Sequence, residues 1–543
     1  MARSWEFSRL PGLNPLFLKY VEDFDAVSSF FAVDYRGLHG KWEGLDTVSN
    51  QVKPDLVEGL LADAERWRCK RKAIENIEAL RDPDTVAVLT GQQVGLFGGP
   101  LFAFYKALSA ILWAQEIEAS TGRRAVPVFW METTDHDFFE VNHARLLNLD
   151  GDEENLSLVN SPAEKRRIVG SIKLNGEIEQ VLRRLYHILP NNTYRGAYLE
   201  VLDTCYRPET TFGDAFAQLF SHLFGEDGLI LYDANNSQCK KATSALVQRI
   251  LSSTSELNNL LAQATTDVTS QGFPAQIQMQ ADKMQLFYAE DGIRYPITAD
   301  GNILYEKKQQ DRAGIEKLKQ IAAEHPDRFL PKVSLRPIFQ DYLFPTAAYL
   351  AGPSEIAYFS QLKPLYNHLD VRMPAIIPRL SLTLIEAKIK KILDRQHFTP
   401  EQLRRGPQAL ITDYLDTDPG NDLVGLFAEA RKMWEDLHDH LTYGLIQIDP
   451  TLEKTAEKNL GRWQQGIHVL EEKARHSLEI RNTNVVSQIK KTCQHLLPNG
   501  IFQERRYATI YYLARYGRSF GQKIRAQASL TNFRHQLIDL EET

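Results

Sequence analysis

The sequence has few cysteines and no long hydrophobic run. Its 543 residues include four widely separated cysteines, Cys69, Cys205, Cys239 and Cys493, and no CxxC pair. This spacing argues against disulfides and against a cysteine-built metal site, so we interpret each cysteine as a buried hydrophobic residue in preference to a nucleophile. No stretch approaches the roughly 18 to 20 apolar residues of a membrane span, and the first residues have no apolar signal-peptide core. We therefore expect a cytoplasmic protein without a membrane partner.

The sequence also lacks an excess of basic residues. The formal net charge is −7, with 43% hydrophobic and 24% charged residues. Nucleic-acid binders usually carry a basic excess, so no nucleic-acid partner is expected, and the composition is that of a folded globular protein. Neither common phosphate motif is present, since the chain contains no GxxxxGK[ST] and no correctly spaced GxGxxG. A single core stops growing near about 250 to 300 residues, so we expect a main domain with additions.

A strand, loop, helix and strand follow one another between residues 86 and 137. Residues 86–89 are small or branched apolar residues, residues 100–120 have helical spacing, and "AVPVFWMETTDHDF" begins with a second apolar run. Strands buried on both faces and joined by a helix predict a parallel, doubly wound α/β sheet. A third strand is expected at 228–235. Insertions are expected at about 150–227 and 265–330, the latter with short strands joined by Asp-Gly turns.

The spacing of the apolar residues changes at about residue 381. Apolar residues then recur in a heptad-like pattern on both sides of an Asp449-Pro450 break, which predicts a long antiparallel helical hairpin. Its second arm is expected to run to about residue 497 and to reach roughly 70 Å. The expected domains are therefore a core at 1–380, a coiled-coil arm at 381–497 and a returning segment at 498–543. Trp434 and Trp463 would be costly to expose, so a homodimer contact is as plausible as an arm packed only on itself.

The stretch "TGQQVGLFGGP" lies at the carboxyl end of the first predicted strand. Ligands bind at this edge of doubly wound sheets, and the helix that follows offers unpaired N–H groups. We therefore predict an anion cradle, with a tight structural turn as the alternative. Lys106 is interpreted as a surface lysine, although it lies within reach of a bound anion. The candidate binding residues are Thr90, Gly91, Gln92, Gln93, Gly95, Gly98 and Gly99.

Carboxylates and histidines crowd the end of the second predicted strand. Carboxylate beside imidazole can orient and tune a general base, and the same groups can bind a cation. Capping of a short helix by Asp135 or Asp137, combined with substrate contact, is favoured over a metal site in which Glu140 and His143 share a helix face. The residues of this cluster are Glu132, Asp135, His136, Asp137, Glu140 and His143.

Further polar residues are set among proline, glycine and aromatic residues later in the chain. Arg379 is a permanent cation suited to binding a carboxylate or phosphate through two hydrogen bonds, and Asp233 ends the third predicted strand. Gln503, Glu504 and Arg505 follow the arm where it rejoins the core. The dense stretch at residues 335–362 adds Arg336, Gln340, Asp341, Glu355 and Tyr358.

Five blocks in this order resemble the bacillithiol biosynthesis cysteine-adding enzyme family, BshC. They are "LTGQQVGLFGGPLFAFYKALSAI", "VPVFWMETTDHDFFEVNH", "SLRPIFQDYLFPTAAYLAGPSEIAYFSQL", "MPAIIPRLSLT" and "LPNGIFQER", and they also contain Trp130 and Asn142. The resemblance implies a Rossmann-like core with connecting insertions and a coiled coil used for dimerisation. It implies a ligase that joins cysteine to the amine of glucosaminyl-malate. Carboxylate activation then implies a nucleotide, ATP or ADP, with Mg²⁺ as a candidate companion ion.

In this interpretation the glycine-rich loop binds phosphate or a substrate anion, while Asp135, His136 and Asp137 hold an ammonium or accept a proton. The sequence departs from related nucleotidyl-transferases, which carry HxGH where "GQQVG" stands here. The nucleotide is therefore expected either at this loop or between the coiled coil and the core. Three alternatives remain: a synthetase-like nucleotidyl-transferase with another amine acceptor, a non-catalytic nucleotide-sensing scaffold, and a metal hydrolase built on Asp135, His136 and His143.

Overall fold

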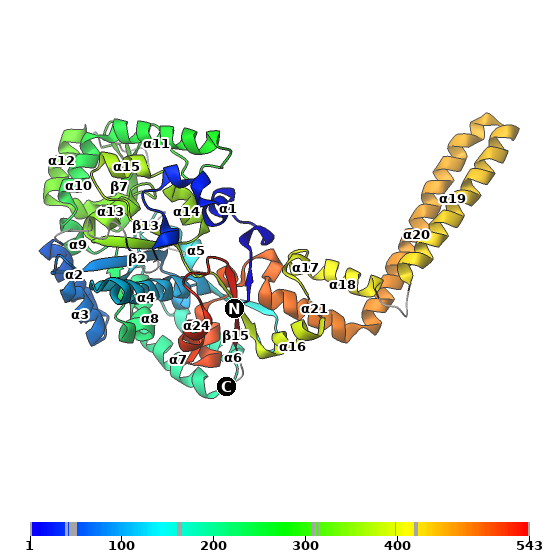
Figure 1. The fold of residues 1–543 in the computed structure, drawn as a ribbon, viewed down its shortest axis with the longest axis horizontal. Helices are drawn as coiled ribbons and strands as arrows, with labels where there is room; N and C mark the ends of the chain where they lie inside the picture. The colour runs from blue at the N-terminus through cyan, green and yellow to red at the C-terminus, as the bar shows by residue number, and fades with distance from the viewer. Residues whose placement is uncertain are drawn as a thin grey trace. The chain divides into compact units, whose positions relative to one another are not determined.

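A computed structural model describes residues 3–38, 42, 52–159, 166–305, 310–311, 314–396, 398–417, 422–517 and 519–540. The chain forms two compact units. Among the described residues, the first unit consists of those up to Leu384 and from Gln503 onward, and the second of those from Ile385 to Phe502. Figure 1 colours the chain from the N-terminus to the C-terminus and labels many of the helices and strands described below.

A five-stranded parallel sheet forms the centre of the first unit. Its order is β13 (Ala375–Pro378), β12 (Thr346–Ala351), β2 (Val86–Gln93), β3 (Ala125–Glu132) and β6 (Ile230–Asp233). Each neighbouring pair is parallel, and most strand residues are buried, as expected for a sheet covered on both faces. The predicted doubly wound α/β core is confirmed. The strands β12 and β13 were not predicted from the sequence.

The register of β2 and β3 brings two polar strand ends to one edge of the sheet. Leu89 lies opposite Val128, and Gln93 at the end of β2 lies opposite Glu132 at the end of β3. Because both strands run in the same direction, the polar residues that follow them meet at the carboxyl edge.

Two helices pack against this sheet through large apolar side chains. Helix α4 (Leu101–Thr121) links β2 to β3 and contacts both strands. On helix α8 (Phe212–Phe224), the rings of Phe216 and Phe220 lie 5.9 and 5.0 Å from that of Phe129. The expected insertion at about 150–227 therefore ends in a helix that covers the central sheet.

A small antiparallel sheet occupies the second expected insertion. Its order is β10 (Gln310–Asp311), β9 (Ile303–Leu304), β8 (Ile293–Thr298), β7 (Lys283–Glu290) and β11 (Phe329–Pro331). The predicted Asp-Gly turn between β7 and β8 is confirmed: Asp291 and Gly292 have φ of 51° and 75°. Two residues with positive φ are what a tight two-residue hairpin requires.

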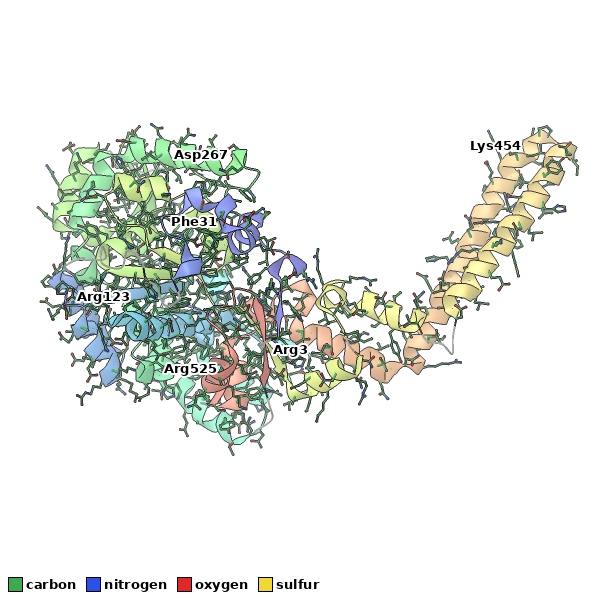
Figure 2. All side chains as sticks on the ribbon, viewed as in Figure 1. Arg3, Phe31, Arg123, Asp267, Lys454 and Arg525 are labelled. Atoms are coloured by element: carbon green, nitrogen blue, oxygen red, sulfur yellow. The ribbon has the colours of Figure 1, made fainter. Side chains whose placement is uncertain are left out.

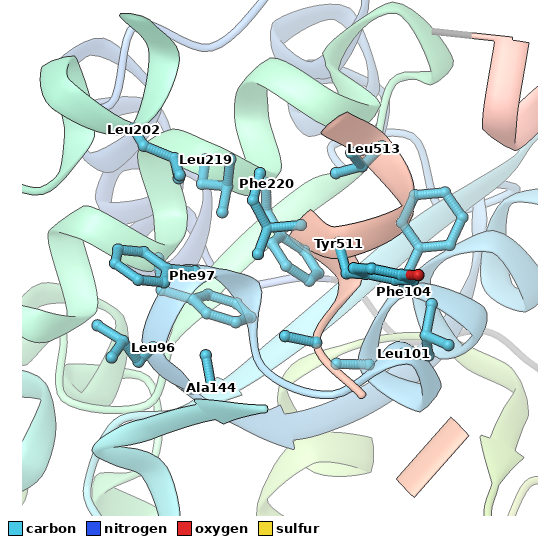
Figure 3. Close-up of a cluster of buried hydrophobic side chains, with 14 of the residues drawn as sticks. Leu96, Phe97, Leu101, Phe104, Ala144, Leu202, Leu219, Phe220, Tyr511 and Leu513 are labelled. Atoms are coloured by element: carbon cyan, nitrogen blue, oxygen red, sulfur yellow. The ribbon is translucent and has the colours of Figure 1, made fainter. Parts of the chain in front are cut away.

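The segment between β2 and α4 is part of the hydrophobic core. Leu96 and Phe97 lie in a single 3-10 turn and pack in one cluster with Leu219 and Phe220 of α8. Figure 3 shows this cluster, which also contains Leu101, Phe104 and the returning residues Tyr511 and Leu513. The last part of the chain thus completes the core of the first unit.

The second unit is helical. The rings of Trp434 and Trp463 stack 4.2 Å apart across the hairpin formed by α19 and α20. The predicted antiparallel hairpin is confirmed, but its second arm ends at Arg481 and not near 497, because the helix breaks at Asn482. At 1.5 Å per residue this arm is roughly 44 Å long. The helices are α16 (Ala387–Gln396), α17 (Pro400–Arg404), α18 (Pro407–Asp416), α19 (Leu423–Ile448), α20 (Glu453–Arg481) and α21 (Thr483–Leu496).

The hairpin leaves several large apolar side chains exposed even though the two tryptophans stack on each other. Leu437, Leu441, Trp463 and Leu470 are about half exposed or more. Figure 2 shows side chains projecting from both helices along their length. Apolar surface of this kind is typical of a protein contact.

The remaining elements connect and cover these parts. Among the described residues, no helix is both long enough and apolar enough to cross a membrane. The other elements are β1 (Ser4–Trp5), α1 (Pro15–Glu22), α2 (Pro54–Arg66), α3 (Arg71–Ala79), α5 (Phe138–Val141), β4 (His143–Leu147), β5 (Glu153–Ser157), α6 (Glu177–Ile188), α7 (Thr193–Cys205), α9 (Ser237–Lys241), α10 (Ser244–Ser252), α11 (Thr254–Ser270), α12 (Gly314–Glu324), α13 (Arg336–Leu343), α14 (Pro353–Phe359), α15 (Lys363–His368), β14 (Leu382–Glu386), α22 (Gln503–Arg506), α23 (Thr509–Tyr516), α24 (Ser519–Gln527) and β15 (His535–Leu540).

The substitution Gly98→Ala tests whether the glycine segment is a packing element. Gly98 has φ +88°, and an added Cβ would lie 3.2 Å from Leu219 Cδ2 in the core. We expect a loss of about 2 kcal/mol or more in the free energy of unfolding, from backbone strain plus overpacking, measured by urea denaturation. Gly122→Ala is the control, because its φ is +73° but no atom lies within 4 Å of the added Cβ. Equal losses in the two variants would contradict the packing role.

Candidate functional site

A cavity of about 640 Å³ opens at the carboxyl edge of the central sheet. All of its lining residues belong to the first unit. They come from the ends of β2 and β3, from α4, from β12 and α14, from the small sheet, and from the segments around Arg379 and Arg505. The lining residues used below are Gly91, Gln92, Gln93, Phe102, Lys106, Trp130, Glu132, Asp135, Glu140, Phe287, Arg294, Lys332, Arg336, Tyr349, Glu355, Tyr358, Arg379 and Arg505.

A buried ion pair between Lys106 and Glu355 lies at the cavity wall. Lys106 Nζ is 2.6 Å from Glu355 Oε2 and also donates to the carbonyl of Gly91 at 2.5 Å. Burial lowers the pKa of Lys106 to about 8, although Glu355 opposes this shift. The pKa of Glu355 lies below its usual value. Burial alone would raise this pKa, but the effect of the Lys106 ammonium, which lowers it, is larger. The interpretation of Lys106 as a surface lysine is therefore wrong, since only 3% of the residue is exposed.

Arg336 is held in one orientation by hydrogen bonds to neutral groups. Its Nη1 donates to Gln340 Oε1 at 3.1 Å, and its Nη2 donates to the hydroxyls of Tyr349 and Tyr358 at 3.1 and 3.3 Å. The guanidinium also lies 5.7 Å from the ring centre of Trp130. Arg336 makes no ion pair with any carboxylate of the described residues. Its charge is thus oriented but not neutralised.

Asp135 is fixed by Arg294, by Gln93 and by the main-chain N–H of His136. It pairs with Arg294 Nη2 at 2.8 Å and accepts a hydrogen bond from Gln93 Nε2 at 2.6 Å. Gln93 Nε2 also donates to Glu140 Oε2 at 2.8 Å. Burial would raise the pKa of Asp135, but the contacts with His136 and Arg294 outweigh burial and hold it well below the usual range. Asp135 therefore remains a carboxylate and is a weak base.

Arg379 and Arg505 add positive charge at the side of the cavity formed by Phe102. Arg379 Nη2 is 2.7 Å from Glu504 Oε1, and its guanidinium lies 5.5 Å from the ring centre of Phe102. Arg379 Nε and Arg294 Nε are both buried and have no hydrogen-bond partner within the described ranges. Buried donors without a partner are costly, so these two nitrogens reduce the stability of the cavity wall.

The charges that line the cavity divide into paired and unpaired groups. Ion pairs neutralise Lys106, Arg294 and Arg379. In the part of the chain that the structure describes, no carboxylate lies within ion-pair distance of Lys332, Arg336 or Arg505, and no cation lies within that distance of Glu132 or Glu140. The cavity therefore presents unneutralised cations and unneutralised carboxylates together, as binding of a zwitterion or of two oppositely charged groups requires.

The comparisons with known proteins agree with this architecture. The family model described as the N-terminal Rossmann-like domain of bacillithiol biosynthesis BshC matches residues 5–380, and the model for the C-terminal coiled-coil domain matches residues 382–540. The chain belongs to the BshC family. A protein of Salinibacter ruber, named "Putative cysteine ligase BshC", is 32% identical over 96% of both chains. Proteins with the same name from Chlorobaculum tepidum and Bacillus cytotoxicus are 31% and 29% identical over at least 90% of each chain.

The glycine segment of this BshC-family chain does not form the predicted anion cradle. Gly95, Gly98 and Gly99 do not line the cavity, and the N–H of Gly98 donates to Gly95 O and to the hydroxyl of Tyr206. At the start of α4, Leu101 N donates to Tyr507 O at 2.9 Å. The returning chain thus occupies groups that were expected to bind an anion. The alternative, a tight structural turn, is the correct description of residues 95–99, whereas Gly91, Gln92 and Gln93 line the cavity.

Several other predicted residues do not line the cavity but hold its lining residues in place. Gln340 connects Arg336 to Asp341. Asp341 accepts from Tyr366 at 2.5 Å, and burial raises its pKa to about 6. Glu504 fixes Arg379. The predicted residues that do not line the cavity are Thr90, Gly95, Gly98, Gly99, His136, Asp137, Asn142, Asp233, Gln340, Asp341, Gln503 and Glu504.

The histidines are placed differently from the prediction. His136 contacts Asp135 and Arg294 through Nδ1 but does not line the cavity, and Asp137 caps α5 by accepting from Glu140 N. Helix α5 ends at Val141 and His143 begins strand β4, so Glu140 and His143 do not share a helix face. Within the described ranges, no three His, Cys, Asp or Glu side chains are close enough together to hold a metal ion.

Sequence analysis did not propose Lys106, Arg294, Lys332 or Tyr349 as site residues. Arg294 and Lys332 come from the small sheet and the segment that follows it, far from β2 in the sequence. No local pattern marks them. For Lys106 a signal was present, since it lies two turns into a helix that is apolar on all sides, where a lysine needs a buried partner.

A double-mutant cycle tests the buried ion pair. Glu355→Gln leaves the Lys106 ammonium without its counter-charge, so we expect a loss of about 3 kcal/mol in the free energy of unfolding by urea denaturation. Lys106→Met should cost a similar amount, and the double variant clearly less than the sum. Lys19→Met is the control, because the Lys19–Asp23 pair is half exposed and should contribute little. Strict additivity of the two buried substitutions would contradict the pairing.

Proposed function

We propose that this chain is a cysteine ligase of bacillithiol biosynthesis, which joins the carboxylate of cysteine to the amine of glucosaminyl-malate. Two findings support this function. The family match extends over nearly the whole chain, and the curated relatives carry the name of a cysteine ligase. The single structural observation that carries the proposal is the cavity at the sheet edge, which offers unneutralised cations and carboxylates side by side.

The unneutralised charges match the charges of the two substrates. Glucosaminyl-malate carries two carboxylates and an amine, and cysteine carries a carboxylate and an ammonium. We assign the malyl carboxylates to Arg336, Lys332 and Arg505, because guanidinium and ammonium groups bind carboxylates by charge-assisted hydrogen bonds. Glu132 then receives the cysteine ammonium. The rings of Trp130 and Tyr358 provide flat surface for the sugar.

Amide formation from a free carboxylate in water is unfavourable, so the cysteine carboxylate needs activation. When bound, ATP supplies a phosphate-containing leaving group for that carboxylate. Arg294 and Arg379 line the cavity, and we propose that their guanidinium groups hold the nucleotide phosphates there and not on the main chain of residues 95–99. Mg²⁺ is expected to accompany the phosphates with water as its other ligand, since it rarely uses a dedicated protein cage.

The chain's own residues position the reactants and receive the proton. Asp135 is too weak a base for proton abstraction, because its contacts with His136 and Arg294 hold its pKa low. Its role is to fix Arg294 and Gln93. Glu140, which faces the cavity and has no cation partner within the described residues, is the carboxylate we assign to receive the proton released when the amine attacks.

The exposed apolar side chains of the α19–α20 hairpin support a homodimer. A second hairpin would bury Leu437, Leu441, Trp463 and Leu470.

A cytoplasmic location is proposed for the same enzyme, because its substrates are small intracellular metabolites in this pathway.

Product formation tests the ligase proposal. Purified protein given cysteine, ATP and glucosaminyl-malate should form the thiol product, followed by mass spectrometry. Arg336→Gln should lower kcat/KM for glucosaminyl-malate by about 30-fold, since one charge-assisted contact contributes roughly 2 kcal/mol. Arg71→Gln is the matched control, because Arg71 is almost fully exposed and lies outside the cavity. Absence of product above background with the unaltered protein would contradict the proposal, whereas product with another amine would favour a synthetase-like transferase.

The pH dependence of substrate binding tests the role of Lys332. Burial and the neighbouring Lys283 lower the pKa of Lys332 to about 8. Its ammonium is therefore present below pH 8 and is lost as pH rises through 8, so KM for glucosaminyl-malate should rise above that pH. In Lys332→Arg the charge persists to high pH, and the rise in KM should move to higher pH. An identical pH profile for the two proteins would contradict the assignment.

A further inference from the structure

The last two residues of β2, Gln92 and Gln93, have side-chain amides that are fixed in opposite orientations. Both residues line the sheet-edge cavity. Neighbouring residues of a strand direct their side chains to opposite faces of the sheet, so the two amides meet different partners. An amide has a donor end and an acceptor end, and its orientation therefore decides which kind of group it can bind.

The amide of Gln92 is oriented by a cation. Lys106 Nζ donates to Gln92 Oε1 at 3.0 Å. The other two N–H groups of this ammonium are used by Gly91 O at 2.5 Å and by Glu355 Oε2 at 2.6 Å. In the reverse orientation Gln92 Nε2 would face the ammonium, and two donors would be in contact. Gln92 Nε2 therefore remains a donor without a hydrogen-bond partner within the described residues.

The amide of Gln93 is oriented by two carboxylates. Gln93 Nε2 donates to Asp135 Oδ2 at 2.6 Å and to Glu140 Oε2 at 2.8 Å. These contacts use both N–H groups of the amide. The reverse orientation would place Gln93 Oε1 against two carboxylate oxygens with no proton between them. Gln93 Oε1 therefore remains an acceptor, with no hydrogen-bond partner in the part of the chain that the structure describes.

A donor and an acceptor on consecutive residues match the two groups that an amide bond joins. Carboxyl oxygens accept hydrogen bonds, and amine N–H groups donate them. In the ligation proposed above, the neutral amine nitrogen of glucosaminyl-malate forms a bond to the carboxyl carbon of cysteine, and one proton of that nitrogen passes to Glu140. The phosphate-containing group leaves with the electrons of its bond to carbon. The oxygen that stays on this carbon gains negative charge during the attack, and a fixed donor stabilises it.

We propose that Gln92 and Gln93 align the two reacting groups. Gln92 Nε2 donates to an oxygen of the cysteine carboxyl group, and Gln93 Oε1 accepts from the amine of glucosaminyl-malate. This assignment rests on the proposed ligase function and on the fixed orientation of the two amides. The charged residues assigned above hold the malyl carboxylates and the cysteine ammonium, whereas this neutral pair holds the atoms between which the new bond forms.

Binding of two matched ligands tests the role of Gln93. The second ligand is 2-deoxyglucosyl-malate, which carries hydrogen in place of the amine. Gln93→Met keeps the length of the side chain and removes the acceptor. The preference of the protein for glucosaminyl-malate over this analogue should therefore fall by about tenfold, the loss expected for one hydrogen bond to a charged group. Isothermal titration calorimetry without ATP measures both dissociation constants, and the Tm verifies folding.

The role of Gln92 is tested with cysteine and cysteamine, which differ by the carboxylate. Gln92→Met should lower the preference for cysteine by about tenfold and leave the preference for the sugar amine unchanged. Gln93→Met should show the opposite result, so each variant is a control for the other. Gln92→Glu and Gln93→Lys keep contacts with Lys106 and with the two carboxylates, respectively, and should lose the same preferences. Gln263→Met, at an exposed glutamine of α11 outside the cavity, should change neither preference.

The outcomes of these titrations separate this proposal from the ligase proposal. Retention of both preferences in the two Met variants, or a loss of affinity by the same factor for both members of a ligand pair, would overturn the alignment role. Failure of the unaltered protein to bind glucosaminyl-malate would overturn it as well. The titrations require no turnover, so a protein that binds both substrates through the two glutamines but forms no product would refute the ligation alone.

Discussion

The buried ion pair between Lys106 and Glu355 is the interaction on which the candidate site depends. Lys106 belongs to α4 and binds the carbonyl of Gly91 on β2, while Glu355 belongs to α14 and accepts from Gly352 N after β12. One pair of side chains therefore fixes two strand ends and two helices at the same edge of the sheet. Two buried charges are tolerated only when they neutralise each other. The pair therefore restricts the relative positions of β2, β12, α4 and α14.

The remaining charges of the cavity follow from this arrangement. Ion pairs and hydrogen bonds hold Asp135, Arg294 and Arg379 in place, and these groups are saturated except for two buried guanidinium nitrogens. The other charged groups, Arg336 and Glu140 among them, remain without a counter-ion in the described part of the first unit. Fixed groups give the cavity its shape, and unneutralised groups give it affinity for charged small molecules. This division is what the proposed binding of carboxylates, phosphates and an ammonium in one cavity requires.

The sequence predicted the parts of the fold that depend on local pattern. Apolar runs and helical spacing identified β2, α4, β3 and β6, and heptad spacing identified the α19–α20 hairpin. The strands β12 and β13 were missed because proline or glycine lies directly beside each of them, at Pro345, Gly352 and Pro374. The glycine segment was misread because its ligand-like features are satisfied by Tyr507 and Tyr206, which lie far away in the chain. Arg294 could not be predicted for the same reason: only the folded chain brings it to Asp135.

The most direct test of the central claim is a crystal structure with glucosaminyl-malate and ATP. The account predicts that the malyl carboxylates lie within hydrogen-bond distance of Arg336 and Lys332, about 3 Å, and that the amine faces the cavity at the ends of β2 and β3. The nucleotide phosphates should lie beside Arg294 and Arg379. Substrate bound elsewhere, with the sheet-edge cavity empty, would contradict the assignment of this cavity as the site of condensation.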